Sequence, residues 1–337
     1  MSITVNHTQL KQLLPKVLKQ QLVAYIRSSP GYGKSESVKQ IAKEYNLKFI
    51  DIRLSTMGIE DLSGLPNLKG DRATYQPFDL FPLEHDKIPE GAGGWLILMD
   101  ELSSVSLAMQ AASYKIILDR QVGQYNLHPN AVVIAAGNKD TDRAVTVRQS
   151  TALKSRLIHL ELTLNHNDWL KWAVENDLDH RVVSYIRFKP DSLNTFNPDS
   201  AENTYSCPRT LHFLSKIIKD EPNLDGLLPL LVGTIGSAGL EFNSYCAIYG
   251  DLPTKEDIIN NPTGCKFKDE GSFKYAISGY LPTIITKANI ASIYQYIERM
   301  SKEFQVISLR NILEKDKTLL TEPCIKSWVV KNASSLL

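Results

Sequence analysis

One eight-residue segment, residues 28–35, constrains the fold of this chain more than any other. It reads Ser-Ser-Pro-Gly-Tyr-Gly-Lys-Ser, a glycine-containing loop that ends in Lys34 and Ser35. A short apolar run at residues 22–26 precedes it, and apolar residues at helical spacing follow it over residues 36–45. The order strand, glycine-rich loop and helix is typical of one unit of a parallel sheet. The segment therefore predicts an α/β fold.

The same loop has the residues needed to hold a nucleoside triphosphate. Its two glycines let successive backbone N–H groups point into one hollow, Lys34 would reach the β and γ phosphates, and the Ser35 hydroxyl suits a magnesium ion. The helix that follows aims the positive end of its dipole at the phosphates. Ser28 stands where such loops usually begin with glycine, so an ordinary glycine-rich turn is the alternative. The residues expected to contact the nucleotide are Pro30, Gly31, Tyr32, Gly33, Lys34 and Ser35.

Composition narrows the class of protein and of partner. The chain has 337 residues, enough for roughly two domains, and is 43% hydrophobic and 22% charged, as soluble globular proteins are. The chain has 38 basic and 37 acidic residues, so its net charge is +1. No overall electrostatic field therefore attracts it to nucleic acid or to an anionic membrane. The polar start of the chain and the lack of a long apolar run predict a cytoplasmic protein without a membrane segment. Four scattered cysteines and seven scattered histidines predict no transition-metal site.

The order of apolar and helical patterns divides the chain. Residues 8–20 predict an amphipathic helix, and the unalternating apolar runs at 95–99 and 131–136 predict buried parallel strands. Residues 63–94 hold many glycines and prolines and predict a long surface excursion. After about residue 163 the pattern becomes helical, with candidates at 167–176, 180–188, 209–219, 227–240, 290–304 and 324–332. We expect an N-terminal helix at 1–20, an α/β core at 21–163 and a helical region at 164–337.

Carboxylates follow the first of the two buried runs. Asp100 would hold the hydration shell of a magnesium ion, and Glu101 would orient and polarise an attacking water. Asn138 comes where the second run ends and would help to position that water. Each has a plain alternative, a solvated strand end for the carboxylates and a turn for the asparagine. Together with the phosphate loop, they predict a site of nucleotide hydrolysis.

This combination resembles the AAA+ ATPases, most closely the MoxR-type branch related to dynein and midasin modules, over roughly residues 20–220. The resemblance implies a P-loop NTPase sheet sandwiched by helices, followed by an α-helical lid and a helical C-terminal extension of unassigned role. It makes residues 28–35 the Walker A loop, residues 96–101 the Walker B strand and Asn138 sensor 1. Arg156 would be the finger that reaches a neighbouring subunit, and Arg209 would be sensor 2 of the lid.

The two arginines have competing interpretations. Arg143 and Arg148 lie close to Arg156, which could instead form a surface salt bridge, and Arg209 could simply begin a helix. Within the resemblance, residues 121–127 correspond to a hairpin and residues 59–66 to an insertion, both facing the centre of a ring. The expected catalytic residues are Glu101, Asn138, Arg156 and Arg209, with Ser35 and Asp100 as metal ligands.

The resemblance implies an ATPase that uses ATP and Mg²⁺ and works as a ring, expected to be a hexamer, to remodel a protein substrate. MoxR-type proteins often have a partner with a von Willebrand factor A domain, which is a further expected partner here. A DNA-processing motor subunit is the alternative, and the near-neutral charge argues mildly against it. A scaffold that binds ATP without turning it over is a third possibility, which the presence of Glu101 and Asn138 disfavours.

Overall fold

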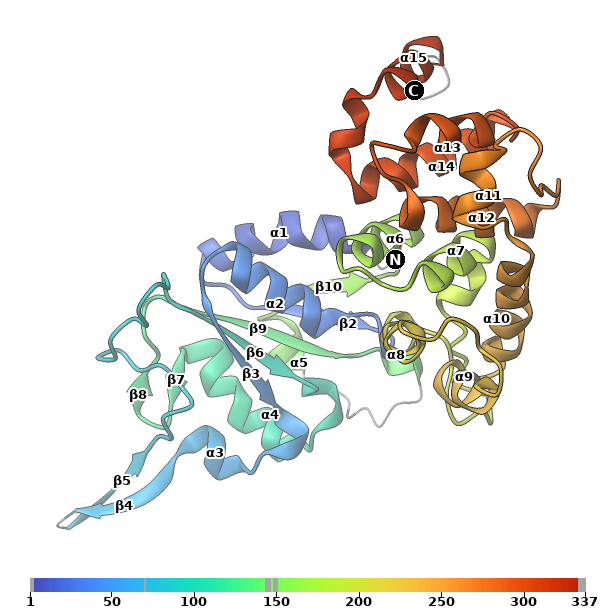
Figure 1. Ribbon diagram of the computed structural model, residues 1–337. Helices are drawn as coiled ribbons and strands as arrows, with labels where there is room; N and C mark the ends of the chain where they lie inside the picture. The colour runs from blue at the N-terminus through green and yellow to red at the C-terminus, as the bar shows by residue number, and fades with distance from the viewer. Residues whose placement is uncertain (1–2, 70, 143–146, 148–150, 333–337) are drawn as a thin grey trace. The chain divides into compact units, whose positions relative to one another are not determined.

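The computed structural model describes residues 3–69, 71–142, 147 and 151–332. The chain divides into two compact units, Met1–Asn165 and His166–Leu337 (Figure 1). Each unit has its own hydrophobic core.

Unit 1 is built on a six-stranded sheet in which every neighbouring pair of strands is parallel. In spatial order the strands are β1 (Thr4–Val5), β10 (Ile158–Leu162), β2 (Ala24–Ser28), β9 (Ala131–Asn138), β6 (Trp95–Asp100) and β3 (Lys48–Arg53). The central strands β6 and β9 are the two unalternating apolar runs of the sequence, and almost all of their residues are buried. A strand covered on both faces needs apolar side chains at successive positions.

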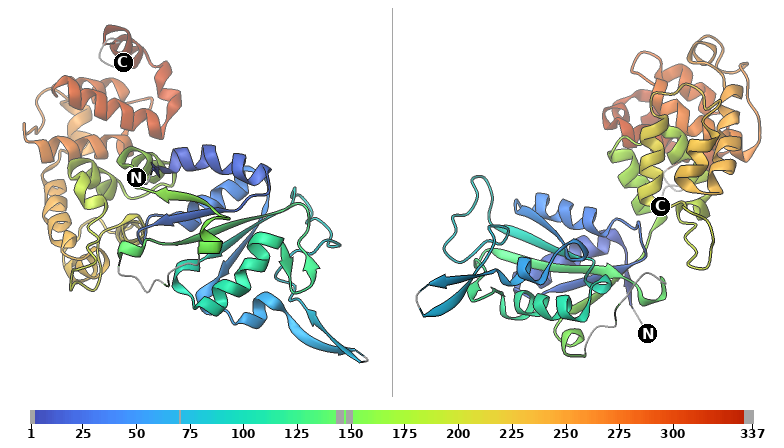
Figure 2. Two further views of the ribbon diagram at one scale, coloured as in Figure 1. Left: turned by 180° about the vertical axis from the view of Figure 1, so that it is seen from behind. Right: turned by 90° about the horizontal axis from the view of Figure 1, so that it is seen from below.

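Helices cover both faces of this sheet, as Figures 1 and 2 show. On one face, Leu96 and Leu98 pack in a cluster with residues of α1 (His7–Lys19) and α2 (Lys34–Glu44). On the other face, Ile97 and Met99 pack with residues of α4 (Leu107–Tyr114). Because successive side chains of a strand point to opposite faces, one strand supplies both cores. The predicted parallel sheet sandwiched by helices is confirmed.

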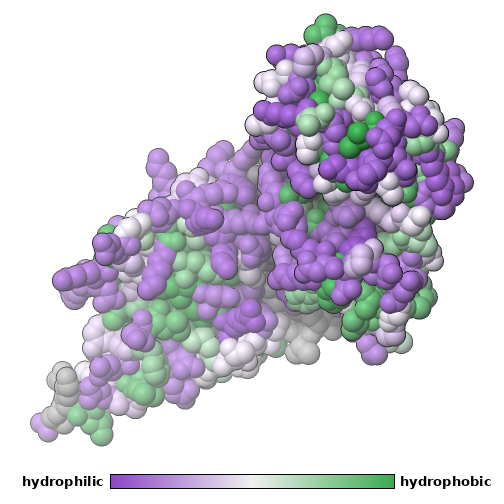
Figure 3. Space-filling model, viewed as in Figure 1, coloured by the Kyte–Doolittle hydropathy of each residue, from purple (hydrophilic) through white to green (hydrophobic). Residues whose placement is uncertain are grey.

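Two segments of unit 1 are more regular than the sequence indicates, and a third is as predicted. Residues 3–5 form β1, which extends the sheet beside β10 before α1 begins. The predicted surface excursion contains a two-stranded hairpin, β4 (Leu65–Lys69) and β5 (Arg72–Gln76), which follows α3 (Ile59–Ser63) and extends away from the sheet (Figures 1 and 2). Hydrophobic residues show on this hairpin in the space-filling view (Figure 3). The predicted short hairpin at 121–127 is present as β7 (Gln121–Val122) and β8 (Tyr125–Asn126).

Unit 2 is helical, as predicted. Its helices are α6 (His166–Glu175), α7 (His180–Phe188), α8 (Pro208–Ile218), α9 (Leu228–Ile235), α10 (Ala238–Cys246), α11 (Lys255–Asn260), α12 (Gly271–Ile284), α13 (Ile290–Ile297), α14 (Lys302–Lys315) and α15 (Pro323–Lys331). The segments 227–240 and 290–304, where the sequence predicts helix, are helical, and each holds parts of two helices. The first break falls at Gly236, whose φ of 67° is left-handed and ends α9.

The sequence pattern does not predict α12, because its glycines and proline are poor helix formers. Gly279 lies inside α12 where a Cβ atom would come within 2.7 Å of the Ser184 side chain of α7. The glycine therefore allows two helices to approach closely, which a propensity argument counts only as a penalty. In the described parts of the chain, no helix is long and apolar enough to cross a lipid bilayer.

Candidate nucleotide-hydrolysis site

The predicted phosphate loop connects the carboxyl end of β2 to the first turn of α2. Gly31 has φ 78° and Gly33 has φ 83°, both in the left-handed region that glycine enters without a steric penalty. These two conformations turn the chain sharply between strand and helix. The backbone conformation therefore explains why the motif has glycine at both positions. Pro30 precedes Gly31, and Tyr32 lies between the two glycines. Both residues are half-buried.

Lys34, the first residue of α2, is buried and surrounded by oxygen atoms. Its ammonium donates to the Ser28 carbonyl at 3.1 Å, to the Ser28 Oγ at 3.0 Å and to the Asn138 Oδ1 at 3.2 Å. The serine that replaces the usual first glycine therefore contributes a hydroxyl that helps to fix Lys34. An anionic acceptor such as a phosphate would bind this ammonium more strongly than these neutral oxygens do.

Ser35 and Asp100, the two residues expected to hold a metal ion, form a hydrogen bond with each other. The Ser35 hydroxyl donates to the Asp100 Oδ2 at 2.6 Å, and the other carboxylate oxygen accepts the Glu101 backbone N–H at 2.8 Å. Two adjacent oxygen ligands of this kind fit a magnesium ion, which prefers oxygen and takes few ligands from the protein when a nucleotide supplies phosphate oxygens. No cluster of three or more metal-binding His, Cys, Asp or Glu side chains occurs in the described part of the chain.

Glu101 has an unusual backbone and a defined side-chain partner. Its φ of 63° is left-handed, a conformation that costs a non-glycine residue of order 1 kcal/mol. This turn follows the last residue of β6, and the Glu101 carboxylate accepts a hydrogen bond from the Ser55 hydroxyl. Ser55 lies in the 3-10 turn Leu54–Thr56 after β3, so the strand beside β6 helps to hold the predicted general base.

The sheet order places Asn138 between the phosphate loop and the carboxylates. Strand β9 lies between β2 and β6, and in its register Asn138 pairs with Ser28. The Asn138 backbone N–H donates to the Ser103 Oγ at 2.9 Å, which fixes the end of the strand. The Asn138 amide thus touches Lys34 from the side of β6, where a side chain that positions water is expected.

A third carboxylate adds negative charge to this edge of the sheet. Burial, followed by the charge of Asp100, raises the pKa of Asp51 above its ordinary value, and Glu101 acts in the same direction. Arg53 and Lys39 oppose the shift. The negative charges of Asp51, Asp100 and Glu101 therefore favour the binding of a cation at this edge. This argument is independent of the hydrogen bond between Ser35 and Asp100.

Several supporting residues were not found from the sequence. His7 Nε2 donates to the Tyr32 carbonyl at 2.8 Å, so the start of α1 contacts the phosphate loop, and the Ser29 hydroxyl donates to Asp142 at 3.1 Å. Ser55 likewise forms a hydrogen bond with the Glu101 carboxylate, and Ser103 forms one with the Asn138 backbone. Ser55 could be proposed from the sequence, because it follows the strand next to β6 and the ends of neighbouring parallel strands lie close together. His7 and Asp142 belong to no motif.

The predicted arginines lie apart from these contacts in the chain. Arg156 is exposed and follows α5 (Thr151–Lys154) in unit 1. Arg209 is exposed at the start of α8 in unit 2, so its relation to the phosphate loop stays a prediction. Arg143 and Arg148, the competitors of Arg156, lie outside the described residues.

Comparison with known proteins gives remote structural likenesses. No family model matches the sequence, and no curated protein matches it. A RuvB variant from Thermotoga maritima is 16% identical, with 76% of this chain and 75% of that chain covered and a TM-score of 0.41. NtrX from Brucella abortus in complex with ATP is 13% identical, with 98% and 68% covered and a TM-score of 0.41. The replication initiator DnaA bound to AMPPCP and single-stranded DNA is 14% identical, with 99% and 95% covered and a TM-score of 0.38.

Proposed function

We propose that this protein is an ATPase that hydrolyses ATP at the carboxyl edge of its parallel sheet. One observation carries the proposal: Lys34, Asn138 and the Ser35–Asp100 pair converge at the ends of β2, β9 and β6. A glycine-rich turn alone would not need a buried lysine, an amide and a carboxylate at one edge.

Each side chain has a task in hydrolysis. Lys34 binds the phosphates, exchanging the neutral oxygens of Ser28 and Asn138 for charged ones. Glu101 orients the attacking water and accepts its proton, and Asn138 helps to hold that water. Ser35 and Asp100 would hold Mg²⁺, which neutralises charge that develops on the phosphate oxygens when it is bound.

The resemblance extends the proposal to a MoxR-type AAA+ ATPase that works as a ring, expected to be a hexamer, and remodels a protein substrate. Arg156 would then complete the site of a neighbouring subunit, and Arg209 would report the nucleotide state. A partner with a von Willebrand factor A domain is part of this proposal and rests on the resemblance alone. Stimulation of ATP hydrolysis by DNA would instead favour the alternative of a DNA-processing motor.

The substitution Glu101→Gln tests the assignment. It keeps the shape and the Ser55 hydrogen bond but removes the base, so we expect ATP to bind with unchanged affinity and to be hydrolysed about 100-fold or more slowly. Binding is measured by titration of a fluorescent ATP analogue, and hydrolysis by phosphate release.

The exposed Glu90 provides the matched control, because Glu90→Gln makes the same chemical change in a loop outside the site. It should leave both measurements as they are in the unaltered protein. Undiminished hydrolysis by the Glu101→Gln protein would refute the role of Glu101.

A further inference from the structure

The start of α1 contacts the backbone of the phosphate loop. The His7 Nε2 lies 2.8 Å from the Tyr32 carbonyl oxygen. Because a carbonyl oxygen only accepts hydrogen bonds, this nitrogen carries a proton and donates it. A Cβ atom on Gly33 would lie 3.7 Å from the same nitrogen, so the His7 ring also borders the next residue of the loop. His7 thus lies against the peptide group that joins Tyr32 to Gly33.

The position of His7 is fixed by the sheet, by a helix cap and by packing. Val5 of β1 pairs with Leu162 of β10, which holds the chain just before α1. Asn6 caps the helix: its side chain accepts the Gln9 N–H at 2.8 Å, and the Gln9 side chain accepts the Asn6 N–H at 3.0 Å. The apolar face of α1 packs with α2 in one core cluster (Figure 1). His7, the first residue of α1, therefore meets the loop from a rigid support.

The peptide group between Tyr32 and Gly33 combines a fixed geometry with a soft rotation. Its bond is trans, like every peptide bond of the described residues, so the Tyr32 C=O and the Gly33 N–H point in opposite directions. Gly33 has φ 83°, and glycine adopts φ of either sign without a steric penalty, so this peptide group can rotate as a unit. Whatever holds the Tyr32 carbonyl therefore sets the direction of the Gly33 N–H.

The order of the strands shows which way this N–H points. Strand β2, which leads into the phosphate loop, lies between β10 and β9. His7 follows β1 and so approaches the loop from the β10 side, whereas Asn138 ends β9 on the other side and accepts from Lys34 there. The Tyr32 carbonyl points toward His7. The Gly33 N–H therefore points away from His7, toward the side of the loop where the Lys34 ammonium lies.

We propose that His7 is a positioning residue of the ATPase site: by holding the Tyr32 carbonyl, it keeps the Gly33 N–H aimed at the phosphates of ATP. This inference rests on the proposed function, because an N–H in that direction serves an anionic ligand. The opposite rotation of the peptide group would turn a carbonyl oxygen toward the phosphates and repel them. His7 precedes Tyr32 by 25 residues and supplies from α1 a support that the loop itself does not contain.

The test uses the full chain and compares His7→Ala, which removes the donor, with His7→Gln, whose side-chain amide can donate from a similar position. ATP affinity is measured by competition with a fluorescent ATP analogue, and hydrolysis by phosphate release. We expect His7→Ala to bind ATP about threefold to tenfold more weakly. KM should rise while kcat stays nearly unchanged, because the Gly33 N–H would bind ATP and the transition state alike. His7→Gln should regain most of the lost affinity.

Two controls separate this role from a structural one. Adenosine has no phosphate, so its competition with the analogue should be the same in every variant, whereas a loss of folded protein would lower kcat and leave KM as it is. His85→Ala makes the same change at an exposed site outside the loop and should behave as the unaltered protein does.

Three results would overturn the role of His7 and leave the proposed function in place. They are unchanged ATP affinity in His7→Ala, equally weak ATP binding in His7→Gln and His7→Ala, and an equal loss of adenosine binding. If the unaltered protein binds no ATP, the proposed function fails and this inference fails with it.

Discussion

Gly137 is the residue whose missing side chain the candidate site most depends on. It precedes Asn138 in β9, and a Cβ atom at this position would collide with the Tyr25 hydroxyl and come within 2.7 Å of the Ser103 Oγ. Ser103 is also the acceptor that fixes the Asn138 backbone. The space at Gly137 therefore sets the position of the amide that touches Lys34.

We expect Gly137→Ala to lower both stability and hydrolysis. The added methyl group must displace Ser103 or the strand, at a cost of roughly 1–3 kcal/mol, and the Asn138 amide moves with it. Thermal unfolding and phosphate release measure the two effects. Gly271→Ala is the control, because a Cβ atom there meets nothing within 4 Å. A Gly137→Ala protein as active as this control would show that Asn138 needs no such support.

At the residue scale, sequence motifs predict the side chains expected to contact the nucleotide, the metal ion or the attacking water. They do not predict the side chains that hold these residues in place by hydrogen bonds. Lys34, Ser35, Asp100 and Glu101 follow from the phosphate loop and from one apolar run that ends in carboxylates. The hydrogen bond from Ser55 to Glu101 joins residues 46 positions apart at the ends of neighbouring strands, and no local pattern encodes such a pairing.

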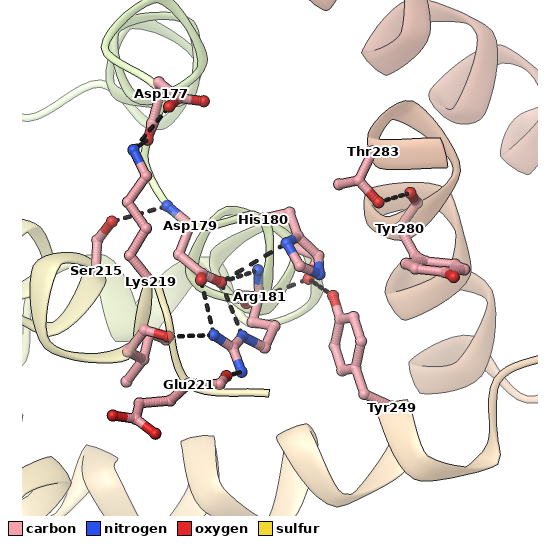
Figure 4. Close-up of polar contacts among 12 residues, drawn as sticks. Asp177, Asp179, His180, Arg181, Ser215, Lys219, Glu221, Tyr249, Tyr280 and Thr283 are labelled. Atoms are coloured by element: carbon pink, nitrogen blue, oxygen red, sulfur yellow. Dashed lines mark hydrogen bonds and ion pairs between the residues drawn. The ribbon is translucent and has the colours of Figure 1, made fainter. Parts of the chain in front are cut away.

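At the scale of elements, the Arg181 side chain connects two helices of unit 2. Asp179 accepts the backbone N–H of Arg181 at the start of α7, and the Arg181 side chain donates to the Ile218 carbonyl at the end of α8 and to the Glu221 carbonyl in the loop after it (Figure 4). The side chains of Asp179 and Arg181 are 3% and 8% exposed. Arg181 thus satisfies a buried carboxylate and two backbone carbonyls, so its loss leaves all three short of a partner.

We expect Arg181→Met to destabilise unit 2 by about 3 kcal/mol, because the methionine fills the space but leaves the buried Asp179 charge unpaired. Arg310→Met on α14 is the matched control, since Arg310 is 64% exposed and its pair with Glu314 should contribute less than about 1 kcal/mol. Urea unfolding of the full chain, followed by circular dichroism, compares them. Equal losses in the two variants would contradict the role given to the buried pair.

Elements with a strong local pattern were predictable, and those stabilised by distant contacts were not. Strands β6 and β9 are unbroken apolar runs, so their burial on both faces follows from the sequence. Helix α12 contains Gly279 and Pro282 and exists because α7 and α14 pack against it, which overrides its poor propensity. Strand β1 has two residues and owes its conformation to β10.

At the scale of the whole molecule, the proposed ring requires residues of one subunit to act on another. Arg156 is exposed in the same unit as the phosphate loop, between the buried Leu153 and Leu157 that hold its segment in place. A guanidinium supplied across an interface stabilises the charge that develops on the transferred phosphate. Such sharing makes activity a property of pairs of subunits, which can be tested by mixing.

We expect Arg156→Ala to abolish hydrolysis while ATP still binds, and mixing this protein with the Glu101→Gln protein to restore part of it. In a randomly mixed ring, about a quarter of the interfaces join an intact Glu101 to an intact Arg156 from the neighbour. Phosphate release is measured for each variant alone and for the mixture. The same mixing with Arg143→Ala or Arg148→Ala in place of Arg156→Ala identifies which arginine acts. If no arginine variant is rescued, no finger acts between subunits, because a residue serving its own subunit's site cannot be replaced by a neighbour.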